Sequence, residues 1–207
     1  MSMQFGRAYF ARRYLELTVN QFEFEPFMIG ALFPDIRQLG TISREATHLE
    51  GASFRALAEE TSSFRAGMLI HNLIDTLRVG YLKEHGVDEV DDMLLATPQK
   101  LIEDELVYSH QADWSREIKV LDKVLDNELA LVQEATVLLW HRIIQDYFRA
   151  GPTPAAFEIL GLQLVGSSPK LLANIEQRRL SLGQDRERRA LINSFIAEFD
   201  RLVVAHG

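Results

Sequence analysis

Hydrophobic residues recur along this chain at helical spacing, three or four residues apart, over nearly its whole length. No segment alternates strictly between apolar and polar residues, and no Asn-Gly or Asp-Gly pair joins two β-branched runs, so the pattern predicts no strand. It favours the all-α class, with a bundle of about eight helices. Residues 34–47 are expected to form a loop. The helical pattern covers residues 5–20, 26–33, 48–60, 64–84, 98–110, 114–127, 128–149, 153–165, 169–182 and 185–204.

The helix predicted at residues 64–84 is the most informative of these segments. Its apolar residues surround the helix instead of forming one stripe, which is typical of a helix buried in the centre of a bundle. It nevertheless carries His71 and Asp75, four residues apart and therefore neighbours on one face. A buried carboxylate without a partner is very costly, so Asp75 requires a cation, a metal ion or hydrogen bonds. Gly67, one turn before His71, is expected to leave space beside the imidazole.

The composition is that of an ordinary globular protein, with 47% hydrophobic and 25% charged residues among 207. We expect one domain over residues 1–207, ending in a helical hairpin at about 169–204. The chain has 30 acidic and 22 basic residues, and its net charge of −8 argues against binding to a long nucleic acid. Because there is no cysteine, a metal site would have to use the six histidines and the carboxylates.

The start of the chain and its hydropathy bear on location. Arg7, Arg12 and Arg13 interrupt the first apolar residues before the core of a signal peptide can form. No apolar run approaches the roughly 18 residues that a membrane span requires. We therefore expect a cytoplasmic protein without a transmembrane segment. The pattern carries no prediction of oligomeric state.

A second group of residues with metal-binding chemistry lies upstream of the central helix. An apolar segment ends at Pro34, which stops the preceding helix and presents Asp35 from a rigid turn. His48 follows thirteen residues after Asp35, where it is expected to open the next helix. With His71 and Asp75, these residues supply two imidazoles and two carboxylates, which suits Zn²⁺, Mn²⁺ or Fe²⁺.

These residues belong to a longer pattern. Residues 27–35 read Phe-Met-Ile-Gly-Ala-Leu-Phe-Pro-Asp, and residues 64–75 read Phe-Arg-Ala-Gly-Met-Leu-Ile-His-Asn-Leu-Ile-Asp. Over about residues 26–80 the chain resembles the zinc-dependent phospholipase C and P1-type nuclease superfamily, all-α enzymes with a Gly-x-x-x-Pro-Asp, His, Gly-x-x-x-His-x-x-x-Asp series. The resemblance implies a phospholipase C-like fold and a zinc-dependent phosphodiesterase activity. The zinc ligands that it implies are Asp35, His48, His71 and Asp75, with Gly30 and Gly67 as the small residues ahead of them.

The remainder of the family's trinuclear site is not matched. This chain has no histidine before His48 and begins without a signal peptide whose removal would create a special N-terminus. The resemblance therefore implies one bound metal ion in preference to three. A second ion would have to recruit residues from elsewhere, and the weaker candidates are Glu105, His110 and His141.

Two arginines near these residues suggest phosphate recognition. Arg37 lies two residues after Asp35, and Arg78 lies seven residues after His71, on the same face of the helix. A guanidinium group offers a planar fork that suits phosphate oxygens. We expect Arg37 and Arg78 to neutralise charge on a phosphoryl group, while Asp35 or Asp75 bridges metals or accepts a proton from the attacking water.

The sequence thus favours a metal-dependent hydrolase of small phosphoric (di)esters. One alternative is a non-catalytic helical binding or scaffold protein that retains a structural metal or a buried His–Asp network. Another is an unrelated all-α protein in which the motif is coincidental. The HD-type metal phosphohydrolases are also all-α, but this chain lacks the adjacent His-Asp pair that marks them.

Overall fold

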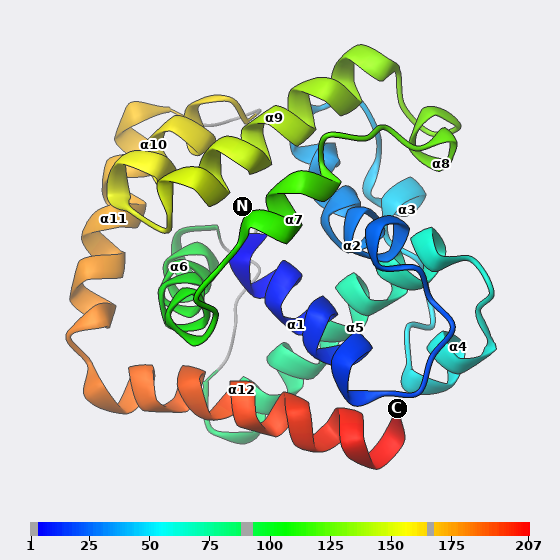
Figure 1. Ribbon diagram of the computed structural model, residues 1–207. Coiled ribbons are helices and arrows are strands. Elements are labelled where there is room, and N and C mark those ends of the chain that lie inside the picture. The colour runs from blue at the N-terminus through cyan, green and yellow to red at the C-terminus, as the bar shows by residue number, and fades with distance from the viewer. Residues whose placement is uncertain (1–3, 88–92, 165–167) are drawn as a thin grey trace.

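The computed structural model describes residues 4–87, 93–164 and 168–207, and this part of the chain is helical without strands, which confirms the all-α class (Figure 1). Short helices within residues 33–47 and 114–149 add to the helical segments expected from the sequence. None of the described helices has the length and apolar character that crossing a membrane demands. The helices are α1 (Gln4–Leu17), α2 (Phe24–Leu32), the 3₁₀ helix η1 (Phe33–Leu39), α3 (Arg44–Thr47), α4 (Phe54–Glu59), α5 (Ser63–Glu84), α6 (Met93–His110), α7 (Ser115–Val120), α8 (Asp126–Leu129), α9 (Glu134–Ala150), α10 (Pro154–Leu162), α11 (Pro169–Gly183) and α12 (Arg186–His206).

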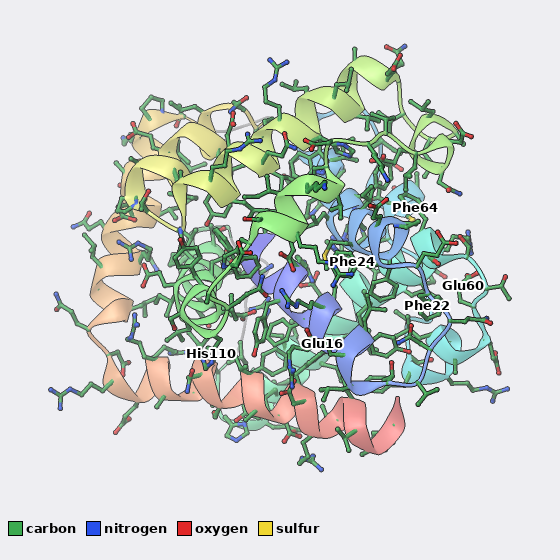
Figure 2. The ribbon with its side chains drawn as sticks, in the orientation of Figure 1. Glu16, Phe22, Phe24, Glu60, Phe64 and His110 are labelled. Atoms are coloured by element: carbon green, nitrogen blue, oxygen red, sulfur yellow. The ribbon has the colours of Figure 1, made fainter. Side chains whose placement is uncertain are left out.

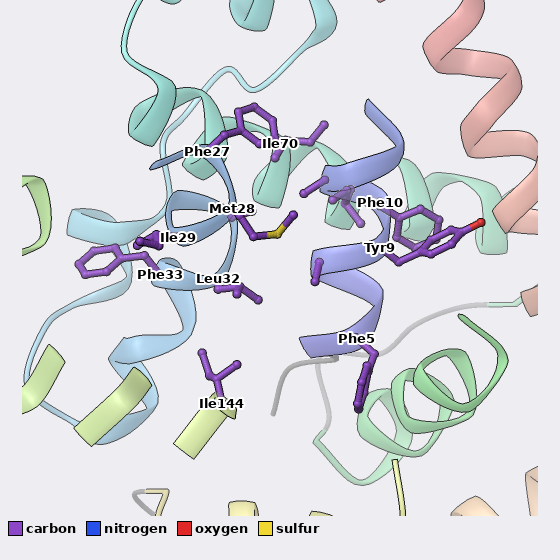
Figure 3. Close-up of a cluster of buried hydrophobic side chains, with 14 of the residues drawn as sticks. Phe5, Tyr9, Phe10, Phe27, Met28, Ile29, Leu32, Phe33, Ile70 and Ile144 are labelled. Atoms are coloured by element: carbon purple, nitrogen blue, oxygen red, sulfur yellow. The ribbon is translucent and has the colours of Figure 1, made fainter. Parts of the chain in front are cut away.

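The centre of the fold is built from α1, α2 and α5. Most of their buried hydrophobic side chains belong to one large cluster, in which Figure 3 shows Phe10 of α1, Met28 of α2 and Ile70 of α5. The prediction that α5 is buried on all sides is correct for its first half, where residues 64–74 are buried almost throughout. It is wrong for the second half, because Val79 is 41% exposed there.

Two glycines allow α2 and α5 to approach each other closely. A Cβ atom at Gly30 would stand 2.0 Å from the carbonyl oxygen of Phe64, and one at Gly67 would stand 2.1 Å from that of Phe27. No side chain fits at such distances, so the two helices pack backbone against backbone at this crossing. The space expected beside His71 is therefore filled by α2, and the role of Gly67 is to permit this contact.

The end of α2 offers main-chain carbonyls to side chains of other helices. Pro34 has no N–H group, so the last carbonyls of α2 lose one main-chain donor. The oxygen of Ala31 accepts a hydrogen bond from His71 at 2.8 Å, and that of Leu32 accepts one from an indole of α9 at 3.2 Å. The chain continues directly into η1, whose first turn carries Asp35 into the interior.

Several predicted helix boundaries between residues 34 and 98 are wrong. The loop expected at residues 34–47 contains η1 and α3, so His48 ends α3 with extended backbone (φ −107°, ψ 108°) and does not open a helix. The helix expected at residues 48–60 is reduced to α4, because Gly51 adopts a left-handed conformation (φ 73°) that breaks it. Pro98 lies inside α6 and not at its start. Because proline has no N–H group, the helix lacks one main-chain hydrogen bond at this position.

The segment at residues 169–204, where a helical hairpin is expected, contains the two helices α11 and α12, which meet at a corner of the molecule (Figure 1). Both α11 and α12 pack on α6. Glu105 of α6 forms ion pairs with Arg179 of α11 and Arg189 of α12, the latter at 3.3 Å. These charged contacts connect three helices, and α12 then runs back so that the C-terminus lies beside the end of α1.

Candidate metal centre

His71 lies in the buried half of α5, against the end of α2. Its Nδ1 is 2.8 Å from the carbonyl oxygen of Ala31, so the ring donates there and keeps its lone pair on Nε2. Burial, reinforced by the charge of Arg7, lowers the pKa of His71 to about 3, and the ring is neutral at pH 7. Nε2 is buried and has no hydrogen-bond partner among the described residues. An imidazole oriented by a carbonyl, with its other nitrogen unpaired, is the usual arrangement of a metal-binding histidine.

The ring of His48 stands against that of His71, with the two centroids 5.2 Å apart and the planes at 85°. The hydroxyl of Thr47 donates to a main-chain carbonyl of α3 at 3.1 Å, and it therefore accepts from Nδ1 of His48 at 3.0 Å. This tautomer leaves the lone pair of His48 on Nε2. Burial lowers the pKa of His48 to about 4, so both imidazoles are neutral at pH 7 and suited to bind a metal.

Asp75 completes a group with His48 and His71, in which one ligand atom of each residue lies within 4.8 Å of the others. One oxygen of Asp75 pairs with Arg7 at 2.6 Å, whereas Oδ1 is buried and has no hydrogen-bond partner in the described part of the chain. Burial by itself raises the pKa of Asp75, but the charges of Arg7 and Lys100 outweigh it and hold that pKa well below its usual range. Ligand atoms around tetrahedral zinc stand about 3.4 Å apart, so small side-chain rotations would bring these three atoms onto one ion.

Asp35, the fourth predicted ligand, stands beside His71 but outside this group of three. Its Oδ2 is 3.9 Å from Nε2 of His71, which is too far for a hydrogen bond. The amide of Gln4 lies 3.5 Å from the same oxygen. Asp35 is 3% exposed, so it borders the centre from the interior.

Arg7 is the residue of this site that the sequence analysis missed. Arg7 is 1% exposed, and its guanidinium donates to the carbonyl oxygen of His71 at 2.8 Å while it pairs with Asp75. The available signal was an arginine between Phe5 and Tyr9 on an apolar helix, because an arginine buried among such residues needs an anionic or carbonyl partner. The sequence indicates that Asp75 needs a cation or hydrogen bonds, and Arg7 is the cation that it pairs with.

The group opens onto a cleft of about 590 Å³ between the α3–α4 region and α5. The cleft is mainly polar, and His48 and Asp75 stand in its wall while His71 lies behind them. The other lining residues are Arg44, Glu45, Leu49, Glu50, Gly51, Ala52, Asn72 and Thr76.

The two predicted phosphate-binding arginines lie near the centre but not in the lining of the cleft. Arg78 is 2% exposed, and its charge helps to lower the pKa of Asp75. Arg37 is half-buried, and its charge acts in the same direction on His48. The arginine that does line the cleft among the described residues is Arg44, which the sequence analysis did not select.

The three weaker candidates for a second ion have partners of their own elsewhere. Glu105 is engaged by arginines of α11 and α12. His110 is exposed beside α12 (Figure 2), with Nε2 at 3.3 Å from Asn193. His141 is buried, and its nitrogens contact Glu128 at 2.8 Å and a main-chain carbonyl at 3.1 Å. None of them belongs to the group formed by the two other histidines and the aspartate.

Comparisons of this chain with protein-family models, with curated proteins and with solved structures find no match. The resemblance to the phospholipase C and P1-type nuclease superfamily therefore rests on residues 26–80 alone, and the finer fold assignment stays a prediction.

Proposed function

We propose that this chain is a metal-dependent hydrolase of small phosphoric esters, with a divalent cation held by His48, His71 and Asp75. The observation that carries the proposal is the meeting of these three ligand atoms within 4.8 Å at the wall of an open cleft. Nε2 of His71 and Oδ1 of Asp75 are buried without hydrogen-bond partners among the described residues. Buried polar atoms are normally paired, so a ligand is the simplest reason for two such atoms together. Two imidazoles and a carboxylate favour Zn²⁺, with Mn²⁺ or Fe²⁺ next, and one such group suits one ion.

A divalent cation in this position would supply Lewis acidity towards a phosphoryl oxygen. The residues of the chain would orient the reaction. Arg7 keeps Asp75 ionised and holds one of its oxygens, so that Oδ1 is directed to the centre. Asp35, 3.9 Å from Nε2 of His71, would serve as a further ligand or would accept a proton from the attacking water. Arg37 and Arg78 would add positive potential around the phosphoryl group.

The cleft supports a small polar substrate. Its volume of about 590 Å³ is that of a pocket for a compact ligand. The carboxylates in its wall and the net charge of −8 oppose a long polyanion such as a nucleic acid. A small molecule with one phosphate ester group is the substrate class that these features favour.

The ion pair between Arg7 and Asp75 favours a second candidate function. At 2.6 Å the guanidinium already neutralises the carboxylate, so the group could stand as a buried polar network in a non-catalytic binding or scaffold protein. The two functions differ in one property, because only the hydrolase needs the cation for turnover.

The experiment is a hydrolysis assay on the full chain with bis-p-nitrophenyl phosphate and p-nitrophenyl phosphate, in the presence of Zn²⁺ or Mn²⁺. We expect turnover by the wild type and a loss of about 100-fold in His48→Gln, because removal of one ligand disrupts the metal centre. The matched control is His110→Gln, which changes an exposed histidine outside the site. Equal rates for the wild type and His48→Gln would contradict the proposal, and bound metal without turnover would favour the binding protein.

A further inference from the structure

Arg44 stands in the wall of the cleft without an ion-pair partner among the described residues. It is the first residue of α3, is exposed, and lines the cleft together with His48 and Asp75. Its charge acts on the imidazole of His48: the pKa of that ring is lowered mainly by burial, and the charge of Arg44 lowers it further. Its side chain makes no hydrogen bond and no ion pair with the residues that the structure describes. A ligand in the cleft therefore meets a guanidinium whose donors are free.

Neighbouring arginines of the same region do have carboxylate partners. Arg55 pairs with Glu59 at 2.8 Å, and Arg65 pairs with Glu60 at 3.2 Å. Acidic residues exceed basic ones in this chain, so partners are plentiful. Arg44 stands apart from these neighbours because its guanidinium remains available at the mouth of the cleft.

The carboxylates closest to Arg44 along the chain line the same cleft, and neither forms an ion pair with it among the described residues. Hydrogen bonding to its own main-chain N–H and to Ser43, together with the charge of Arg44, lowers the pKa of Glu45, but Glu45 and Arg44 form no ion pair in the described part of the chain. Glu50 also lines the cleft and makes no ion pair within the described residues. The wall thus presents one guanidinium among the carboxylates of Glu45, Glu50 and Asp75, which admits a single anionic group and opposes a chain of them.

We propose that Arg44 forms an anion subsite at the mouth of the cleft, where it binds the phosphoryl group of the ligand opposite His48 and Asp75. The guanidinium fork can donate to two phosphoryl oxygens at once. This inference rests on the proposed function. It adds an exposed arginine, which a ligand can reach, to the buried Arg78 as a phosphate-binding residue. The ligand class is a small molecule with a single phosphoryl group.

The test is calorimetric titration of inorganic phosphate into the full chain, both zinc-loaded with excess metal removed and stripped with a chelator. We expect the dissociation constant of Arg44→Gln to exceed that of the wild type by about 10- to 100-fold, as for the loss of a charge-assisted hydrogen bond. Arg44→Lys keeps the charge without the fork, so it should lose only a few-fold in affinity. The control is Arg55→Gln, which removes an exposed arginine paired with Glu59 and should bind phosphate as the wild type does.

The subsite would be overturned by a phosphate affinity in Arg44→Gln equal to that of the wild type, or by equal weakening in Arg44→Gln and Arg55→Gln. Absence of phosphate binding by the wild type would overturn it as well. Zinc content is measured in the same samples. This measurement separates failure of the Arg44 subsite from failure of the metal centre on which the proposed function depends. A wild type that binds phosphate through Arg44 but takes up no zinc keeps the subsite and overturns the metal centre.

Discussion

The close crossing of α2 and α5 can be tested with one methyl group. A Cβ at residue 67 would stand 2.1 Å from the carbonyl oxygen of Phe27 and 2.7 Å from the nitrogen of Ala31, both rigid main-chain atoms. Because real Cβ contacts are not shorter than 3.0 Å, Gly67→Ala requires the helices to separate by about 0.9 Å. Such a shift takes the 2.8 Å hydrogen bond between His71 and Ala31 past the limit of about 3.5 Å.

The free-energy change for Gly67→Ala follows from three contributions. Overpacking of a rigid contact costs about 1–3 kcal/mol, and loss of a buried hydrogen bond costs about 1–3 kcal/mol. The higher helix propensity of alanine returns about 1 kcal/mol. The variant should therefore be less stable by about 1–5 kcal/mol, which lowers the melting temperature of a chain of this size by about 2–20 °C.

The assay is urea unfolding followed by far-ultraviolet circular dichroism, with a second glycine of the same helix as the control. Gly80 is exposed on α5, and a Cβ there meets nothing within 4 Å. Gly80→Ala should stabilise the protein by about 0.5–1 kcal/mol through helix propensity alone. If Gly67→Ala were also neutral or stabilising, the backbone contact between α2 and α5 would be refuted.

Three further predictions concern buried charged groups. Arg7→Leu leaves Asp75 without its cation and should cost about 3–5 kcal/mol in urea unfolding, whereas equal stability would show that the pair is not needed. Burial raises the pKa of Asp104 to about 8, so its native state holds a proton that the unfolded state loses near pH 4. Asp104 therefore stabilises the native state at low pH, and this stabilisation is lost as the pH rises towards 8, by about 1.4 kcal/mol per pH unit. Asp104→Asn should abolish that slope. A pH profile of the variant that runs parallel to that of the wild type would contradict this prediction. His141→Phe removes the partner of buried Glu128 and should cost about 2–4 kcal/mol without changing zinc content; loss of zinc would place His141 in the metal centre.

Local signals account for the parts of the fold that could be predicted from the sequence. The central helix begins where Ser62 accepts a hydrogen bond from the third following residue, and it ends at Glu84, two residues before Gly86, whose φ is 75°. Both are properties of a few adjacent residues, and the pairing of His71 with Asp75 on one face follows from the helical period. The class, the main helix and two of the four predicted ligands therefore follow from short-range rules.

The rest depended on contacts that join distant parts of the chain. Arg7 and Asp75 are far apart in sequence, and no periodicity within either helix shows that they meet. The apolar residues after His48 keep a helical period and predict a helix there, but the left-handed turn at Gly51 overrides that period. Arg44 acquires its place in the cleft only because α3 folds against η1 and faces α5.

Metal analysis of the purified full chain tests the central claim most directly. Samples equilibrated with zinc and freed of excess metal would be measured by mass spectrometry, with circular dichroism on the same samples to confirm folding. We predict one zinc ion per chain in the wild type and in His110→Gln, and none in folded His48→Gln. A wild type with no more zinc than His48→Gln would contradict the assignment of His48, His71 and Asp75 as a metal centre.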